Sequence, residues 1–200
     1  MTAETSRGQA HTLEGIAAAI LVLGSVVFAL QVTAVTPLTA STASQHIENQ
    51  QRAVASGVLS IAKETGALDS SVRYWNETGV TFHGTPAEGY YLHGGPPNRF
   101  GSMLNDSFGE AGIAFNVDVT YLTPSGAQRN RRMVYQGTPS DHAVVVGRTV
   151  VLYDDDVLLD ASGNETDTTL GETNGYFAPD MAPSSHVYNV LRVEVTVWQM

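Results

Sequence analysis

The chain has 200 residues, enough for about one ordinary globular domain. It carries 10 basic and 20 acidic residues, a formal net charge of −10. That balance argues against nucleic acid as a partner, because phosphate binding needs a concentrated basic surface. There is no cysteine, which excludes disulfides, thiolate zinc sites and cysteine nucleophiles. Lys63 is the single lysine. An acidic, lysine-poor composition is typical of proteins kept soluble in concentrated salt, so we predict a halophilic source, with ordinary drift as the alternative.

A long apolar run follows the first 14 residues, which form a short polar leader and processing region. The run extends from Ile16 to Val35, and no acidic residue, lysine or arginine occurs between Glu14 and Glu48. Twenty helical residues span about 30 Å, the hydrocarbon thickness of a bilayer. We therefore predict one retained transmembrane helix over residues 15–36. The alternatives are a secretory signal cleaved near Ala34 or Ala40 and a buried core helix.

The residues before the apolar run carry a resemblance to a known family. Arg7, Gly8, Gln9 and Ala10 are followed by Glu14 and then by the run itself. This combination resembles the class III signal segment of type IV pilin-like proteins of archaea, including those of halophiles. The resemblance implies that a prepilin peptidase cuts after Gly8 or Gln9 on the cytoplasmic side and leaves the apolar helix on the mature protein.

Glu14 would be the sixth mature residue after a cut at Gly8, and the fifth after a cut at Gln9. It thereby resembles the acidic residue near position five of many pilins, which implies a role in assembly. A carboxylate at the edge of a membrane helix is costly unless it is partnered, and the N-terminal ammonium of a neighbouring copy could partner it. The alternative is an interfacial residue that marks where the membrane begins.

Residues 37–68 are predicted to form an amphipathic helix or stalk. Pro37 is expected to kink the helix or to start a new one, and Gly66 to end it. The predicted polar face consists of Arg52, Ser56, Ser60 and Lys63. The predicted apolar stripe follows the helical period and consists of Ala40, Ala43, Ile47, Val54, Val58, Ile61 and Leu68.

Residues 69–200 are predicted to form an extracellular, antiparallel, β-rich domain. Alternating apolar residues indicate strands over 113–121 and 191–197, and 132–136 can return on the first of these as a hairpin. Residues 143–152 favour a second strand pair with a bulge or bend at Gly147, residues 98–109 a short helix, and 84–97 and 171–185 surface loops. The predicted fold class is α+β, with the amphipathic half of the long N-terminal helix packed on an antiparallel sheet.

Candidate chemistry in this domain is sparse. Asp154, Asp156 and Asp160 belong to an acidic cluster whose oxygens make a weak calcium candidate, although the EF-hand pattern is absent and a solvated hairpin tip is the favoured interpretation. Ser140-Asp141-His142 contains the residue types of a catalytic triad, but adjacent residues in an extended chain cannot converge. We therefore expect no enzyme activity, no cofactor and no resident metal.

Three sequons follow the apolar run, where an exported domain would meet a glycosylation system. They begin at Asn76, Asn105 and Asn164. With the short leader inside the cell, the acidic domain lies outside. The expected protein is a single-pass, pilin-like subunit of a surface filament or its assembly machinery, with lipid, prepilin peptidase and copies of itself or other pilin-like subunits as partners. The alternatives are an anchored ligand- or partner-binding protein that does not polymerise and, more remotely, an anchored hydrolase.

Overall fold

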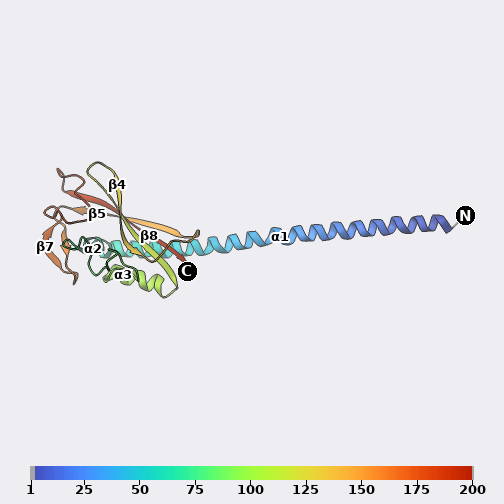
Figure 1. The fold of residues 1–200 in the computed structure, drawn as a ribbon, viewed down its shortest axis with the longest axis horizontal. Helices are drawn as coiled ribbons and strands as arrows, with labels where there is room; N and C mark the ends of the chain where they lie inside the picture. The colour runs from blue at the N-terminus through green and yellow to red at the C-terminus, as the bar shows by residue number, and fades with distance from the viewer. Residues whose placement is uncertain (1–2, 200) are drawn as a thin grey trace. The chain divides into compact units, whose positions relative to one another are not determined.

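The computed structural model describes residues 3–199, together with the side chains of residues 11–31 and 45–199. The chain divides into two compact units, Met1–Ile47 and Glu48–Met200. Helix α1 contributes residues to both units, and every later element belongs to the second (Figure 1). The elements in chain order are α1 (Ala3–Glu64), α2 (Ala67–Arg73), β1 (Trp75–Asn76), β2 (Thr81–Phe82), α3 (Arg99–Leu104), the π-helical turn η1 (Asn105–Gly109), β3 (Ile113–Leu122), β4 (Gln128–Tyr135), β5 (Val144–Tyr153), β6 (Val157–Leu159), β7 (Glu165–Thr169) and β8 (Val187–Gln199).

The first unit consists of the N-terminal part of α1. Residues 11–31 are all exposed, and the segment His11–Gln31 is long and apolar enough to cross a membrane. Such a segment is compatible with a single-pass membrane protein. The expectation that Pro37 starts a new helix is wrong, since α1 is helical from Ala3 to Glu64. The side chains of Ala40 and Ala43, assigned to the apolar stripe, lie outside the described residues.

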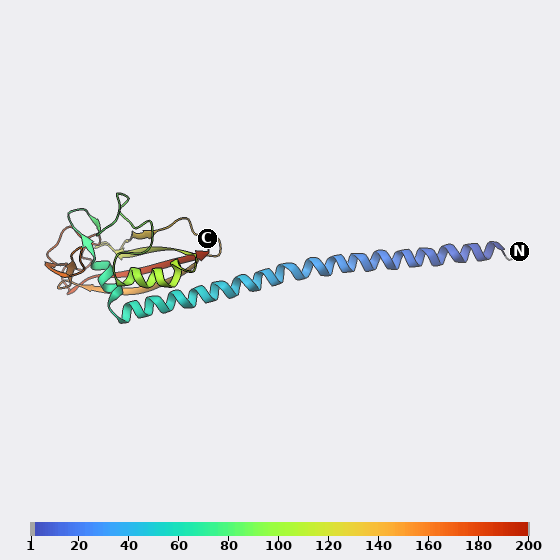
Figure 2. The ribbon, with the colours of Figure 1, turned by 90° about the horizontal axis from the view of Figure 1, so that it is seen from below.

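The second unit is built on a four-stranded antiparallel sheet with the strand order β4-β3-β8-β5. The C-terminal strand β8 is central and pairs along its length with both β3 and β5. One face of the sheet is covered by the helices of this unit, α3 with η1 and residues 48–64 of α1 (Figure 2). The rings of Phe108 in η1 and Phe115 in β3 lie 6.0 Å apart within this core. The α+β class and the antiparallel sheet are confirmed.

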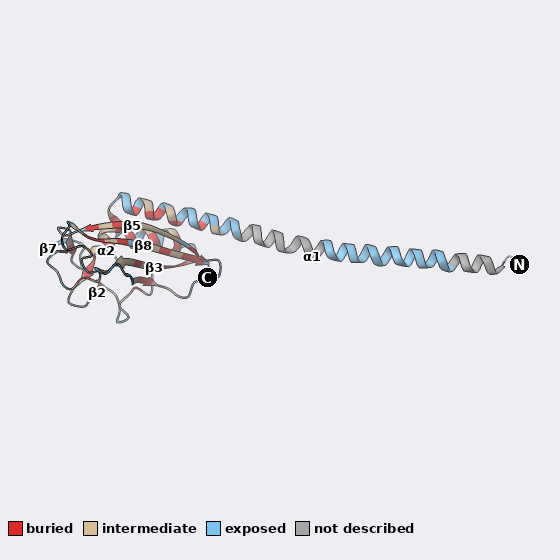
Figure 3. Ribbon diagram, turned by 90° about the horizontal axis from the view of Figure 1, so that it is seen from above, coloured by how far each residue is buried: buried red, intermediate tan, exposed pale blue. Residues whose placement is uncertain are grey.

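The buried face of α1 differs in register from the predicted stripe. Val58 is buried, as predicted, and so are Ala55, Leu59 and Ala62, whereas Val54 and Ile61 are 39% and 52% exposed. Figure 3 shows buried and exposed residues mixed along the part of α1 that belongs to the second unit. Ala55 and Ala62 belong to the same buried core as Leu59, so the buried face of the helix includes small side chains as well as large ones. The prediction failed because it weighted Val54 and Ile61 above the alanines beside them.

The predicted polar face of α1 is also partly engaged with the sheet. Arg148, on the edge strand β5, donates from Nη2 to the hydroxyls of Ser56 (3.0 Å) and Ser60 (2.8 Å). These bonds satisfy a half-buried guanidinium, which would otherwise lose its hydration without compensation. Arg148 therefore fixes one flank of α1 against β5.

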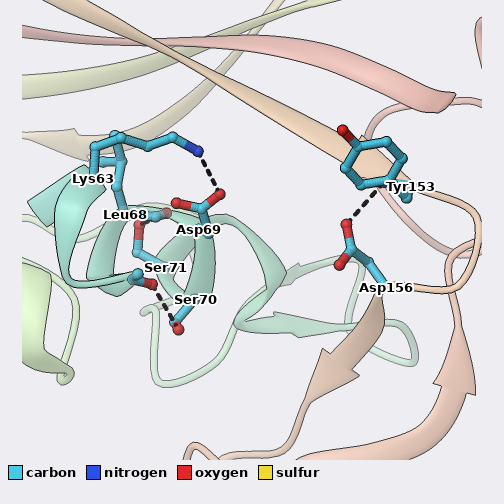
Figure 4. A network of polar contacts seen from close by, with 8 residues as sticks. Lys63, Leu68, Asp69, Ser70, Ser71, Tyr153 and Asp156 are labelled. Atoms are coloured by element: carbon cyan, nitrogen blue, oxygen red, sulfur yellow. Dashed lines mark hydrogen bonds and ion pairs between the residues drawn. The ribbon is translucent and has the colours of Figure 1, made fainter.

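Gly66 ends α1, as predicted, because its φ of +71° is the left-handed conformation that glycine adopts without steric cost. The chain then enters α2, so Leu68 is a buried residue of a second helix and not of the predicted stalk. Lys63 Nζ lies 2.7 Å from Asp69 Oδ1 and links the last turn of α1 to α2 (Figure 4).

The remaining predictions for the β-rich domain are largely confirmed. Residues 98–109 form α3 and η1, and the strands expected at 113–121, 132–136 and 191–197 are β3, β4 and β8, each somewhat longer than predicted. The prediction of a second strand pair within residues 143–152 is wrong. These residues form one strand, β5, because Gly147 stays in register opposite Glu194 and the irregularity falls instead at Leu152 and Tyr153.

The register of α1 can be tested with a matched pair of truncations. Leu59→Ala removes a fully buried side chain and should lower the free energy of unfolding by about 2–5 kcal/mol, whereas Ile61→Ala should cost less than about 1 kcal/mol. Unfolding of the full chain in detergent micelles is followed by the fluorescence of Trp75 and Trp198, which are both buried in the second unit. A larger loss of unfolding free energy for Ile61→Ala than for Leu59→Ala would support the apolar stripe predicted from the sequence.

Candidate functional site

The face of the sheet opposite the helices is the candidate site. Successive side chains of a strand point to opposite faces, and directly paired residues share a face. Val193 of β8 pairs with Val119 and with Arg148, and all three therefore belong to the helix-covered face. The outer face consists of the residues between them, and these are mostly polar.

Two polar rows cross this outer face. In the first, Thr120 of β3 and Thr149 of β5 both pair with Arg192 of β8, and Asn130 of β4 pairs with Thr120. The second row runs across the same four strands and consists of Arg132 of β4, Asp118 of β3, Glu194 of β8 and Gly147 of β5. Each row thus brings together residues that are far apart in the sequence.

The four charges in these rows form two ion pairs. Arg192 Nε donates to Glu194 Oε1 at 2.8 Å, and Arg132 Nε lies 3.8 Å from Asp118 Oδ1. The two carboxylates occupy directly paired positions, where like charges repel. Burial raises the pKa of Asp118; Arg132 opposes this rise, Glu194 adds to it, and hydrogen bonds from Asn130 and Arg132 also oppose it. The local net charge is close to zero.

Gly147 leaves room for the guanidinium of Arg192. A Cβ atom at Gly147 would lie 2.9 Å from both Cζ and Nη2 of Arg192, closer than carbon atoms approach in folded proteins. Because glycine has no side chain, the guanidinium can lie directly over the backbone of β5. Gly147 therefore permits a contact and does not introduce the predicted bend.

A shallow groove of about 390 Å³ lies on this part of the sheet. The side chains of Thr120, Thr149 and Gln128 line it, and they form no hydrogen bonds with other residues in the described part of the chain. Arg192, which also lines the groove, uses Nε for Glu194, and its two Nη groups form no hydrogen bond within the described residues. The full lining consists of Thr120, Tyr121, Leu122, Gln128, Thr149, Val190, Leu191, Arg192 and Glu194.

Two tyrosines extend the outer face beyond the second row. The guanidinium of Arg132 lies 4.1 Å from the ring centroid of Tyr135 and 5.7 Å from that of Tyr90. The two rings are edge-on to each other at 5.9 Å. Cation–π contact of this kind holds Arg132 in place while it faces Asp118.

The predicted processing and assembly residues belong to the first unit. The side chains of Arg7, Gly8, Gln9 and Ala10 lie outside the described residues. Glu14 is exposed within the apolar segment, and its Oε2 lies 3.7 Å from Nδ1 of His11 one turn earlier. The structure therefore places Glu14 in the segment that could span a membrane.

Two of the three weak calcium candidates, Asp156 and Asp160, accept hydrogen bonds from the protein's own loops. Asp160 accepts hydrogen bonds from the backbone N–H groups of Ser162 and Asn164, and hydrogen bonds of this kind hold the pKa of its carboxyl below the ordinary value. Asp156 accepts from the N–H of Tyr153 at 2.8 Å (Figure 4). Across the described residues, no group of three or more histidine, aspartate or glutamate side chains is placed to hold a metal, so Asp154, Asp156 and Asp160 do not form the suggested cluster.

The three sequons occupy different local structures. Asn76 ends β1, is half-buried and accepts a hydrogen bond from the N–H of Gly79. Asn105 begins η1, and its Oδ1 accepts from the N–H of Gly95. Asn164 is exposed in the β6–β7 connection, where its amide contacts Asp160.

The Ser140-Asp141-His142 run does not assemble a triad. Its three residues are exposed, and Nδ1 of His142 lies 3.1 Å from Oε1 of Glu48. The outer face of the sheet was not predicted from the sequence. Alternation of polar and apolar residues shows which residues of one strand share a face, but it does not show which strands are neighbours. The polar residues between the valines of β3 and β8 were the available signal.

The chain matches, over residues 7–197, the model of a family of unknown function (DUF7288), and it belongs to that family. The match includes the apolar segment of α1 as well as nearly all of the second unit. No curated protein and no solved structure matches the chain. The family description assigns no activity, so the function has to be argued from the residues themselves.

The carboxylate pair predicts a pH dependence of stability. The pKa of Asp118 is raised in the folded state, so folding favours the protonated carboxyl group. The contribution of Asp118 to the free energy of unfolding is therefore fully present below the ordinary pKa of 3.8 and is lost as the pH rises through the raised pKa. Asp118→Asn should therefore unfold at higher denaturant concentration than the parent at neutral pH, with a difference that shrinks toward pH 3.5. Asp141→Asn, at an exposed position, is the control. Equal pH profiles for parent and Asp118→Asn would contradict the assignment.

Proposed function

We propose that the protein is a membrane-anchored, pilin-like subunit of a cell-surface filament or of the machinery that assembles it, in a halophilic archaeon. The observation that carries the proposal is the continuity of α1. The same helix contains the exposed apolar segment His11–Gln31 and supplies Ala55, Leu59 and Ala62 to the core of the second unit. A helix that is both anchor and core element favours retention of the apolar segment over its removal as a signal.

The composition of the apolar segment supports helix packing within lipid. Gly15 and Gly24 have open space where a Cβ would lie, and small residues allow neighbouring helices to approach closely. Ser25 donates its hydroxyl to the carbonyl of Val22 at 2.8 Å, so this polar group is satisfied within its own helix, as a lipid environment requires. The small residues of this segment are Gly15, Ala17, Ala18, Ala19, Gly24 and Ser25.

In this proposal a prepilin peptidase cuts after Gly8 or Gln9, and the second unit lies outside the cell. The sequons at Asn76, Asn105 and Asn164 then face a compartment in which glycans are attached. Glu14 pairs with the N-terminal ammonium of a neighbouring copy, because a carboxylate at the membrane edge needs a partner of opposite charge. The partners are lipid, the peptidase and other pilin-like subunits.

Processing can be tested by mass spectrometry of the mature N-terminus. The expected chain begins at Gln9 or Ala10, and Gly8→Val should accumulate uncut protein that begins near Met1. An intact N-terminus in the parent, or a start near Ala40, would exclude prepilin processing. A soluble ectodomain in the medium would do the same.

Assembly can be tested with two exposed glutamates of α1. Glu14→Gln should be processed and inserted normally but should yield at least about tenfold fewer surface filaments, since a neutral amide cannot pair with an ammonium. Glu64→Gln, at the end of the same helix, is the matched control. Filaments are counted by electron microscopy of intact cells. Normal filaments with Glu14→Gln would remove Glu14 from the assembly role.

A second candidate function is that of an anchored protein whose ectodomain binds a ligand without polymerising. The groove on the outer face of the sheet favours it, because the side chains of Thr120, Thr149 and Gln128 that line it have no hydrogen-bond partner within the described residues. Deletion of the gene separates the two candidate functions. Loss of surface filaments supports the pilin-like subunit, and unchanged filaments support the anchored protein that binds a ligand without polymerising.

A further inference from the structure

We propose that the groove on the outer face of the β4-β3-β8-β5 sheet binds a neutral oligosaccharide. The inference goes beyond the role in a filament, since it concerns what the second unit contacts and stands whether or not the subunit polymerises. It rests on three features of the groove: its paired charges, its unpaired neutral groups and the fixed position of Arg192.

The paired charges argue against an ionic ligand. In the groove, Arg192 donates to Glu194 at 2.8 Å, and next to the groove lining Arg132 lies 3.8 Å from Asp118. An anion would have to compete with these carboxylates, within a chain whose net charge is −10. A cation would meet the two guanidinium groups that accompany the carboxylates. The arrangement therefore favours a ligand without net charge.

The neutral groups argue for a ligand rich in hydroxyls. Thr120 and Thr149 flank Arg192 in one row, and Gln128 lies at the end of the groove on β4. Thr120 on β3 and Thr149 on β5 are separated by β8, so they lie two strand spacings, about 10 Å, apart, a span that two adjoining sugar rings can cover. Threonine hydroxyls and the glutamine amide both donate and accept hydrogen bonds, which matches the dual character of a sugar hydroxyl. An apolar ligand would leave all of them unpaired.

The position of Arg192 makes the site pre-organised. Its guanidinium lies over Gly147 and donates to Glu194, and this contact restricts the side chain before a ligand binds. These groups stand on regular strands and not on loops. The groove volume of about 390 Å³ falls in the range of small-ligand sites.

The test uses the full chain in lipid nanodiscs, which avoids sugar-headed detergents that would occupy the groove. The probes are an array of neutral oligosaccharides of glucose, galactose, mannose and N-acetylglucosamine, with sulfated and sialylated glycans included. The strongest binder is then titrated by calorimetry. We expect binding of at least one neutral oligosaccharide and no preference for the charged glycans.

Four variants locate the site. Thr120→Val and Thr149→Val remove hydroxyls with little change of shape, and each should weaken binding about five- to tenfold. Gly147→Ala should weaken it at least as much, because the new methyl group displaces the Arg192 guanidinium without removing its charge. Thr196→Val is the matched control, since Thr196 lies on the same face but outside the groove lining and should bind like the parent. The fluorescence of Trp75 and Trp198 checks that each variant is folded.

The proposal is overturned if none of the neutral oligosaccharides binds, if only charged glycans bind, or if folded Thr120→Val, Thr149→Val and Gly147→Ala all bind like the parent. It is also overturned if Thr196→Val loses as much affinity as they do. These outcomes are independent of the N-terminal cleavage and filament experiments, so the two proposals can fail separately.

Discussion

The contact between the C-terminal part of α1 and the sheet is the constraint on which the second unit depends. Ala55, Leu59 and Ala62 are buried in the core that the sheet's inner face forms, and Arg148 reaches from the edge strand to two serines of the helix. The valines of β8 belong to the same buried core as these helix residues and those of α3 and η1. Because the same helix contains the apolar segment, the element that completes the core also carries the candidate membrane anchor.

Once one face of the sheet is committed to the helices, the other face is free to carry polar groups. The central position of β8 is decisive, because it brings Arg192 and Glu194 between the polar residues of β3 and β5. The directly paired carboxylates of Asp118 and Glu194 would destabilise an ordinary surface. Here each is accompanied by an arginine, and Gly147 makes room for one of the two.

The two proposals assign different tasks to the two units. The first unit supplies a segment suited to lipid and to helix packing, and the second supplies a rigid polar surface. A subunit of this kind would present its groove wherever the anchor holds it. Membership of the DUF7288 family joins both units in one description, since the match covers residues 7–197.

Elements with strong local patterns followed from the amino-acid sequence alone. The apolar run, the end of α1 at Gly66 and the alternation of β3 and β8 could all be predicted, because hydrophobic periodicity and glycine conformation act over a few neighbouring residues. Tertiary structure decided the buried face of α1, the continuity of β5 and the neighbours of β8. Those depend on contacts between distant parts of the chain, such as that of the Arg192 side chain with Gly147, and on pairing between strands as distant as those of Thr120 and Arg192. Long-range pairing leaves no periodic trace in either strand alone, and for that reason the candidate groove became visible only in the folded chain.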